Sequence, residues 1–377
     1  MAFLHPVFAV IFIFLFLCTV LEVYGNGKKQ SWYVWAGGIM FVLVGGFRYF
    51  VGADYPIYNQ LFHGFSIYVS YQDVADKAMF ITNHEQIEWI FVLLNKIIGD
   101  LGMPFFMVTF VMAVITVSLK LSTIFQNVAF PAMAMLLYYM PVIFFEDFGQ
   151  MRQGIGIAIC VFSFRYIKSR NLPMFLLMMY LALGFHKTAV VFIPAYWLVK
   201  IPLNSYRIFL VISLSVILAP LEVYRIAGSL LTAIAPQDIS GGYEGYVDDS
   251  TYGQTLGAGL TDIVKIFFIL VIIIYDKEAC KKVLYYEYMR NLGVCGFCIY
   301  YLFRYNMIFA IRLPGAYMFF ATMFLIPNIM FAVKDSIKRV LHFGFTLYLI
   351  SMYFYFGNGA AQGGNFGKGY RNVLWSR

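Results

Sequence analysis

Residues that could bind an anion or accept a proton stand close together in the first third of the chain. Arg48, Asp54 and Tyr58 fall within eleven residues, and Gly52 between them permits a tight turn. Such a turn could bring the Asp54 carboxylate back towards the Arg48 guanidinium. The group could therefore bind an anion and accept a proton, although a structural Arg–Asp pair would explain the spacing equally well.

A second group opens an apolar run at Glu146 and Asp147, and Arg152 and Gln153 follow with glycines nearby. An arginine costs about 2.5–3.5 kcal/mol at the centre of a membrane helix, and at a helix N-terminus it opposes the helix dipole. A pyrophosphate ligand would suit both the guanidinium and the free backbone N–H groups. The alternative is a salt bridge from Arg152 to Glu146 or Asp147.

Further candidates occupy predicted turns later in the chain. His186 lies between two apolar runs, and its ordinary pKa of about 6.5 would allow it to relay a proton. A hydrogen-bonded turn histidine is the simpler alternative. Arg304 and Arg312 add two cations, and with Arg48 and Arg152 they make four arginines on one predicted side. This excess favours an anionic ligand at that side.

An acidic stretch near 236–259 has no Lys or Arg, and its carboxylates alternate with tyrosines. This combination suits sugars, because sugar rings stack on aromatic faces and sugar hydroxyls form hydrogen bonds. A solvated glycine-rich loop is the alternative. The acidic and aromatic residues of the 236–259 stretch are Asp238, Tyr243, Glu244, Tyr246, Asp248, Asp249 and Tyr252.

The residue types give little support to metal, redox or nucleic-acid chemistry. Metal ligands do not cluster, so no metal and no other cofactor is expected, although Glu146 and Asp147 could hold a divalent ion. Cys295 and Cys298 have the spacing of a redox motif, but they stand in an apolar run and are better explained as small core residues. The net charge of +8 is spread in short clusters, which argues against nucleic-acid binding.

The scaffold that positions these groups must lie in a membrane. The chain is 62% hydrophobic and only 12% charged, with a mean hydropathy of +0.76, whereas a soluble domain carries about 25% charged residues. We therefore expect an all-α polytopic membrane protein forming a single transmembrane domain over 1–377. About twelve spans are expected, the first of them a retained helix, near 3–24, 32–47, 103–119, 128–145, 151–167, 172–185, 188–200, 206–222, 260–276, 291–308, 312–333 and 340–356.

Basic clusters fix the expected orientation. Placing them in the cytoplasm puts both termini, the loops 48–102 and 223–259, and the candidate residues on the outer side. The apolar stretch 87–99 is too short to span, so we expect a re-entrant or interfacial helix there. The basic clusters are Lys28/Lys29, Arg165/Lys168/Arg170, Lys200/Arg207, Lys277/Lys281/Lys282/Arg290 and Lys334/Lys338/Arg339.

Together these blocks resemble the EpsG-like branch of the Wzy-type polysaccharide polymerases. The resemblance implies a multi-pass enzyme of the bacterial inner membrane. It would polymerise repeat units of O-antigen, capsule or exopolysaccharide, carried on undecaprenyl pyrophosphate, at the periplasmic leaflet. The blocks that carry it, in the family's order, are Arg48 through Tyr58, the Glu88 segment, Met151-Arg152-Gln153, Phe185-His186 and Arg312 through Tyr317.

On this interpretation, His186, Asp54 or Glu88 accepts the proton of the acceptor hydroxyl, and His186 is preferred because it titrates in the right range. The expected partners are the lipid-linked oligosaccharide, membrane lipid and a protein that regulates chain length. Rival hypotheses are an O-antigen ligase, a polyprenyl-phosphate-sugar transferase, and a flippase or exporter with charged residues in mid-membrane. The substrate-binding residues would be Arg48, Tyr58, Arg152, Gln153, Arg304, Arg312 and Tyr317.

Overall fold

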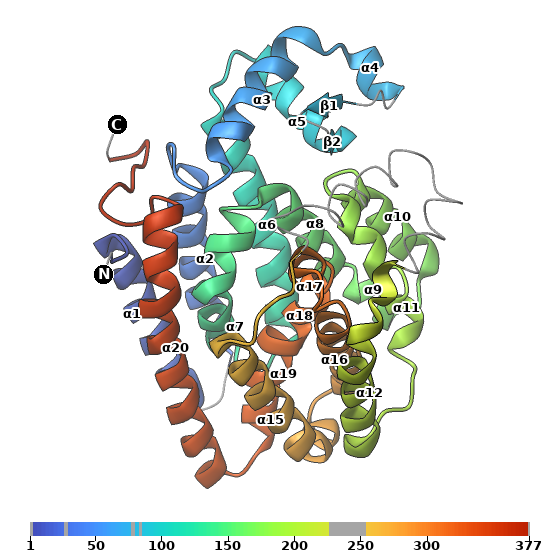
Figure 1. The fold of residues 1–377 in the computed structure, drawn as a ribbon. Helices are drawn as coiled ribbons and strands as arrows, with labels where there is room; N and C mark the ends of the chain where they lie inside the picture. The colour runs from blue at the N-terminus through green and yellow to red at the C-terminus, as the bar shows by residue number, and fades with distance from the viewer. Residues whose placement is uncertain (1–2, 26–28, 77–79, 83–84, 226–253, 376–377) are drawn as a thin grey trace.

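The chain folds into a bundle of helices that is covered at one end by a smaller cap (Figure 1). The computed structural model describes residues 3–25, 29–76, 80–82, 85–225 and 254–375. The bundle consists of α1 (Pro6–Tyr24), α2 (Ser31–Gly46), α6 (Phe106–Asn127), α7 (Pro131–Leu137), η1 (Tyr138–Asp147), α8 (Met151–Phe162), α9 (Phe164–Lys168), α10 (Leu172–Leu183), η2 (Lys187–Phe192), α11 (Ala195–Leu198), α12 (Ser205–Leu218), η3 (Ala219–Leu221), α15 (Leu260–Lys282), α16 (Tyr286–Leu302), α17 (Met307–Arg312), α18 (Gly315–Phe319), η4 (Phe320–Phe324), α19 (Leu325–Ala332) and α20 (Asp335–Gly363).

The bundle is that of an all-α polytopic membrane protein, as the composition predicted. Four helical stretches, Pro6–Tyr24, Phe106–Asn127, Gly315–Ala332 and Asp335–Gly363, are long and apolar enough to cross a membrane. Shorter apolar helices, among them α2, α10 and α12, complete the bundle. The outward face of α1 carries exposed hydrophobic side chains three or four residues apart, so hydrocarbon must be its solvent. These side chains are Val10, Ile13, Leu17 and Leu21.

Several helices run further than the hydrophobic pattern predicted. α6 was expected to end at 119 but continues through Lys120 to Asn127, and α15 ends at Lys282 instead of 276. α20 covers Asp335–Gly363 instead of 340–356. A polar residue ends a hydrophobic run in the sequence, but it does not end a helix when another helix supplies its partner.

The end of the bundle opposite the cap gathers basic side chains. Lys29 Nζ donates to the carbonyl of Phe125 at 3.1 Å, and Lys168 Nζ donates to the side chain of Asn127, the last residue of α6. Lys282 at the end of α15 donates to the last carbonyl of α19 at 2.7 Å. Basic clusters far apart in the sequence therefore share one end, as the orientation argument requires.

One of the charges assigned to that end is buried instead. Arg290 is 3% exposed and forms an ion pair with Asp276 at 3.1 Å. Its neighbour Asn291 donates to carbonyls of 198, 199 and 201 at the end of α11. The expectation that Arg290 stands in a loop before a helix at 291–308 is thus wrong, because α16 begins at Tyr286 and carries the arginine into the bundle.

The cap lies above the ends of α2 and α6 that are opposite the basic side chains, called here the outer ends, and includes the helix expected at 87–99 (Figure 1). That helix, α5, has 12 residues and is about 18 Å long, too short to cross a hydrocarbon core of about 30 Å. Lys96 on α5 donates to the carbonyl of Ser66 on α3 at 3.1 Å. After α5, Gly102 takes φ +67°, which favours glycine and turns the chain into α6. The cap consists of α3 (Tyr55–Tyr68), α4 (Tyr71–Ala75), the antiparallel strands β1 (Phe80–Thr82) and β2 (Glu85–Ile87), and α5 (Trp89–Asp100).

Two further stretches are the acidic tyrosine loop and the C-terminal tail. The acidic tyrosine loop, from Asp238 to Tyr252, lies outside the described residues. The C-terminal tail packs on the outer end of α2, where the backbone N–H of Tyr49 donates to Arg371 and that of Val373 to Phe47, at 3.0 and 2.8 Å. The tail is therefore part of the bundle's outer rim.

Arg48 fastens this rim to the rest of the bundle. Its side chain is 1% exposed, and its guanidinium donates to the carbonyls of Gly45, Val51 and Phe148, the last two at 3.1 and 3.0 Å. The ring of Phe148 lies 5.5 Å from the guanidinium carbon. Arg48 thus joins the end of α2 to the turn that precedes α8.

We expect Arg48→Ala to lower stability strongly, because each buried acceptor left unsatisfied costs about 1–3 kcal/mol. The measurement is the thermal unfolding midpoint in detergent, together with abundance in membranes, against the exposed control Arg207→Ala. If Arg48→Ala has the same unfolding midpoint as the control and loses only ligand binding, Arg48 is a substrate-binding residue and not a structural one.

Candidate functional site

An ion pair at the start of α8 organises the candidate site. Arg152, in the first turn of α8, is 9% exposed, and its Nη1 lies 2.7 Å from Glu88 Oε2. The other carboxylate oxygen of Glu88 accepts the backbone N–H of Lys187 at 3.0 Å. Glu88 directly precedes α5, so one carboxylate joins the cap, α8 and the turn before η2. Arg152 pairs with Glu88 and not, as the sequence alternative had it, with Glu146 or Asp147.

Aromatic rings hold the guanidinium of Arg152 in place. It lies 5.7 Å from the ring of Tyr58 and 6.0 Å from that of Phe91, both within the range of a cation–π contact. Burial raises the pKa of the Tyr58 hydroxyl; Arg152 opposes the shift and the charge of Asp54 adds to it. Asp54, one turn before Tyr58, is therefore close enough to act on this group. The structure thus brings Asp54, Tyr58, Glu88 and Arg152 to one place.

His186 lies in the turn beside this pair and is 8% exposed. Its Nδ1 accepts the backbone N–H of Thr188 at 3.3 Å and lies 2.8 Å from the Thr188 hydroxyl. Because Nδ1 is an acceptor, the neutral ring carries its proton on Nε2. Burial, followed by the charges of Arg152, Arg312 and Lys187, lowers the pKa of His186 well below its usual range. His186 is consequently a neutral hydrogen-bond donor at neutral pH.

Gln153 connects the ion pair to α17. It is 3% exposed, and its Nε2 donates to the carbonyl of Arg312 at 2.9 Å. Its Oε1 is buried and has no hydrogen-bond partner in the described part of the chain. Nearby, Arg312, Thr188 and Tyr317 line a cavity of about 10 Å³, near the lower limit for one water molecule. The Tyr317 hydroxyl donates to the Val191 carbonyl at 2.9 Å, so Tyr317 is a wall of this cavity.

Two of the four predicted arginines have other partners. The Arg48 guanidinium is directed at the backbone carbonyls of Val51 and Phe148. Arg304 makes a bidentate pair with Asp262, both distances being 2.9 Å. The candidate anion-binding cations are therefore Arg152 and Arg312, with Lys187 beside them.

A charged cluster that the sequence analysis missed lies deeper in the bundle. Lys120 is fully buried, with its Nζ 2.6 Å from Asp147 Oδ1 and 3.8 Å from Glu146 Oε2. The Tyr138 hydroxyl donates to the other oxygen of Asp147. Lys120 stands about 21 Å from the start of α6 at 1.5 Å per residue, and its side chain leans back towards the outer end. Lys120 and Asp147 therefore form a charged pair inside the bundle, which the sequence analysis did not predict.

This cluster also bears on the suggested divalent ion. An ammonium group occupies the position beside Asp147 and Glu146 where such an ion would bind. In the described residues, no group of three His, Cys, Asp or Glu side chains has the geometry of a metal site. The sequence does contain a signal for the buried Lys120 cluster. The apolar run continues past Lys120 for several residues, which indicates a charge inside a span.

The geometry can perform two tasks. Arg152 and Arg312 supply positive charge and hydrogen-bond donors at a helix N-terminus, which suits a phosphate or pyrophosphate. The Glu88 carboxylate and the His186 N–H lie beside them and could bind or deprotonate a hydroxyl. Gly156 on α8 faces this corner, where a Cβ would come into contact with the Cβ of His186 at 3.4 Å.

Comparison with known proteins gives one match. The model of the EpsG family matches residues 31–366, which covers most of the chain and confirms the resemblance seen in the sequence. No curated protein and no solved structure matches the chain.

We expect Lys120→Met to destabilise the fold by about 3–5 kcal/mol, because it leaves the Asp147 charge buried without its ammonium partner. The double variant Lys120→Met/Asp147→Asn should recover part of this loss. The readout is the unfolding midpoint in detergent. Lys338→Met is the control, since its partner Asp335 is 90% exposed and a surface pair contributes about 0–1 kcal/mol. Equal midpoints for the two lysine variants would contradict this role.

Proposed function

The chain belongs to the EpsG family of membrane proteins of polysaccharide biosynthesis, and on this premise we propose that it is a glycosyltransferase that polymerises lipid-linked repeat units. The donor is an oligosaccharide on undecaprenyl pyrophosphate, and the acceptor is a second such unit. One observation carries the proposal: Arg152, Arg312 and Lys187 lie around His186, and the carboxylates of Glu88 and Asp54 lie beside them. This corner has an excess of positive charge and a proton acceptor within it.

The cations would bind the pyrophosphate. In the reaction, the bond between the anomeric carbon of the donor sugar and the pyrophosphate oxygen breaks, and the pyrophosphate leaves with the electron pair. Negative charge grows on that oxygen, so fixed guanidinium groups stabilise the transition state more than the ground state. Arg152 is held in place by Glu88 and by two rings, which reduces the cost of ordering it.

Glu88 is our preferred proton acceptor. A hydroxyl oxygen of the acceptor sugar attacks the anomeric carbon, the new glycosidic bond forms, and the hydroxyl proton passes to the carboxylate. Each Glu88 oxygen has one described donor, Arg152 or Lys187, and each carboxylate oxygen can accept a second. The geometry of His186 points to another role: its Nε2–H would donate to the substrate. Asp54 is the alternative carboxylate.

The outward orientation is part of the proposal. Basic side chains gather at the end of the bundle opposite the cap, and in a bacterial inner membrane that end faces the cytoplasm. The corner around Arg152 then faces the periplasm, where undecaprenyl-linked units with completed oligosaccharides are joined. A chain-length regulator would act from the same side.

Export is the second candidate function, because Lys120 and Asp147 form a charged pair inside the bundle, a feature typical of transporters. Against it, Lys120 is fully buried and already neutralised, so this pair gives a substrate no path. A ligase would share the donor and differ in the acceptor.

We expect a strain that lacks the protein to accumulate single repeat units, and wild type to restore the ladder of longer glycans. Arg152→Ala should not restore it, and Arg152→Lys should do so only in part, since an ammonium lacks the planar pair of donors. Electrophoresis of the glycans is the measurement, with membrane abundance checked and Arg207→Ala as the control. If the deletion strain still makes long polymer, stranded inside the cell or unattached, the polymerase proposal is wrong and export or ligation takes its place.

We expect His186→Gln to retain polymerisation within about tenfold of wild type, because Gln keeps an N–H donor, while His186→Ala loses more. Glu88→Gln should lose about 10²–10⁴-fold, as for removal of a general base. Because the pKa of His186 lies well below its usual range, wild-type rates should show no inflection near pH 6.5. Rates from membranes between pH 5.5 and 8 test this; an inflection there that disappears in both His186 variants would make His186 the base.

A further inference from the structure

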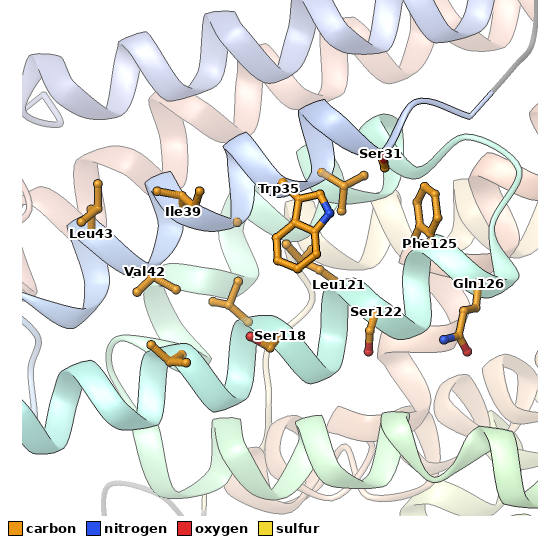
Figure 2. A pocket seen from close by; sticks show the side chains of 14 residues that line it. Ser31, Trp35, Ile39, Val42, Leu43, Ser118, Leu121, Ser122, Phe125 and Gln126 are labelled. Atoms are coloured by element: carbon orange, nitrogen blue, oxygen red, sulfur yellow. The ribbon is translucent and has the colours of Figure 1, made fainter.

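A groove between α2 and α6 has a volume of about 570 Å³ (Figure 2). It extends over residues 31–43 of α2 and 114–126 of α6, about 18 Å along each helix at 1.5 Å per residue. None of its described lining residues is charged. The side chains that shape it most are Trp35, Ile39 and Leu43 on α2 and Ser118, Leu121 and Phe125 on α6.

Small residues line the middle of the groove. Gly38 and Ser118 are among them, and Gly38 lets α2 approach α6 closely there, because a Cβ on Gly38 would lie 2.9 Å from Leu121 Cδ1. Trp35 is 73% exposed and Ile39 56% exposed, and both stand on α2, one of the shorter apolar helices of this membrane bundle. The surroundings of the groove are thus hydrocarbon, and its occupant must be a hydrocarbon chain.

An apolar stripe of side chains continues from the groove towards the candidate site. Phe47 extends the α2 stripe of Trp35, Ile39 and Leu43 at four-residue spacing, and Phe110 does the same for α6. The two rings lie 4.6 Å apart.

Beyond these rings, the path enters the cap. Phe105, before α6, packs on Tyr55 at 4.9 Å, and one turn further along α3 the ring of Tyr58 lies beside Arg152. An apolar path therefore leads from the groove to the ion pair of Arg152 and Glu88.

We propose that this groove holds the isoprenoid chain of the substrate while the pyrophosphate lies at Arg152; the proposal rests on the function proposed above. Lipid tails are as apolar as the groove, so a free acyl chain gains no hydrophobic energy by entering it. A chain whose head group is bound at Arg152 is different, because the tether raises its local concentration beside the groove. This favours the substrate's own chain over bulk phospholipid.

The test is photo-cross-linking of the full-length protein in nanodiscs of phosphatidylethanolamine and phosphatidylglycerol. The probe is undecaprenyl pyrophosphate with a diazirine in its chain, and mass spectrometry maps the labelled peptides. We expect label on 31–43 and 114–126, lowered at least about fivefold by Ser118→Phe, because overfilling displaces the occupant. Ser351→Phe, on an exposed position of α20, is the matched control and should change nothing.

Two results would overturn the proposal: label spread evenly over lipid-facing helices, or equal labelling of the groove by a diazirine-bearing phosphatidylethanolamine. Because labelling needs no polymerisation, the two proposals fail separately. Label in the groove combined with an intact glycan ladder in Arg152→Ala would retain the chain site and reject the polymerase mechanism. Absence of label in the groove, together with loss of the glycan ladder in Arg152→Ala, would reject only the groove.

Discussion

A charge inside a bilayer must find its partner within the protein, and this constraint explains most of the architecture. Lys120 pairs with Asp147, Arg290 with Asp276, and Arg48 with three backbone carbonyls. Lys120–Asp147 and Arg290–Asp276 each join two helices, and Arg48–Phe148 joins residues 100 positions apart, so the pairing that neutralises a charge also fixes how the helices pack. The ion pair of Arg152 and Glu88 obeys the same rule at the outer end, but beside a histidine, further cations and a small cavity.

The site depends on this framework in a definite way. Lys120 holds Asp147 at the end of η1, Arg48 holds Phe148 in the turn that follows, and α8 starts a few residues later with Arg152 in its first turn. Glu88 reaches that turn from the cap and His186 from the turn between α10 and η2. The position of the guanidinium thus follows from contacts in four separate parts of the chain. A groove on the lipid-facing side of α2 and α6 adds a place where a substrate's tail could lie while its head group is bound (Figure 2).

The sequence predicted the features that depend on local pattern. Each segment predicted from a hydrophobic run contains helix in the structure. The short run at 87–99 correctly indicated a helix that is too short to span. Pattern could not say which polar residues pair across the bundle. Lys120 was taken as a helix end because a lone charge looks the same whether it faces water or an aspartate on another helix. For the same reason, Arg48 and Arg304 were grouped with Arg152 by their shared side, although carbonyls and Asp262 are their partners. His186 was identified as important, but its role depends on the hydrogen bond from Thr188, which only the fold shows.

The central claim is that the corner around Arg152 joins sugars by displacing a lipid pyrophosphate. The most direct measurement uses purified protein in proteoliposomes with undecaprenyl-pyrophosphate-linked repeat units as the only substrate, and follows glycan length together with released undecaprenyl pyrophosphate. The account predicts that wild type releases one undecaprenyl pyrophosphate for each glycosidic bond formed, and that Arg152→Ala does neither at equal protein content. Movement of intact repeat units across the bilayer without release of undecaprenyl pyrophosphate would contradict it.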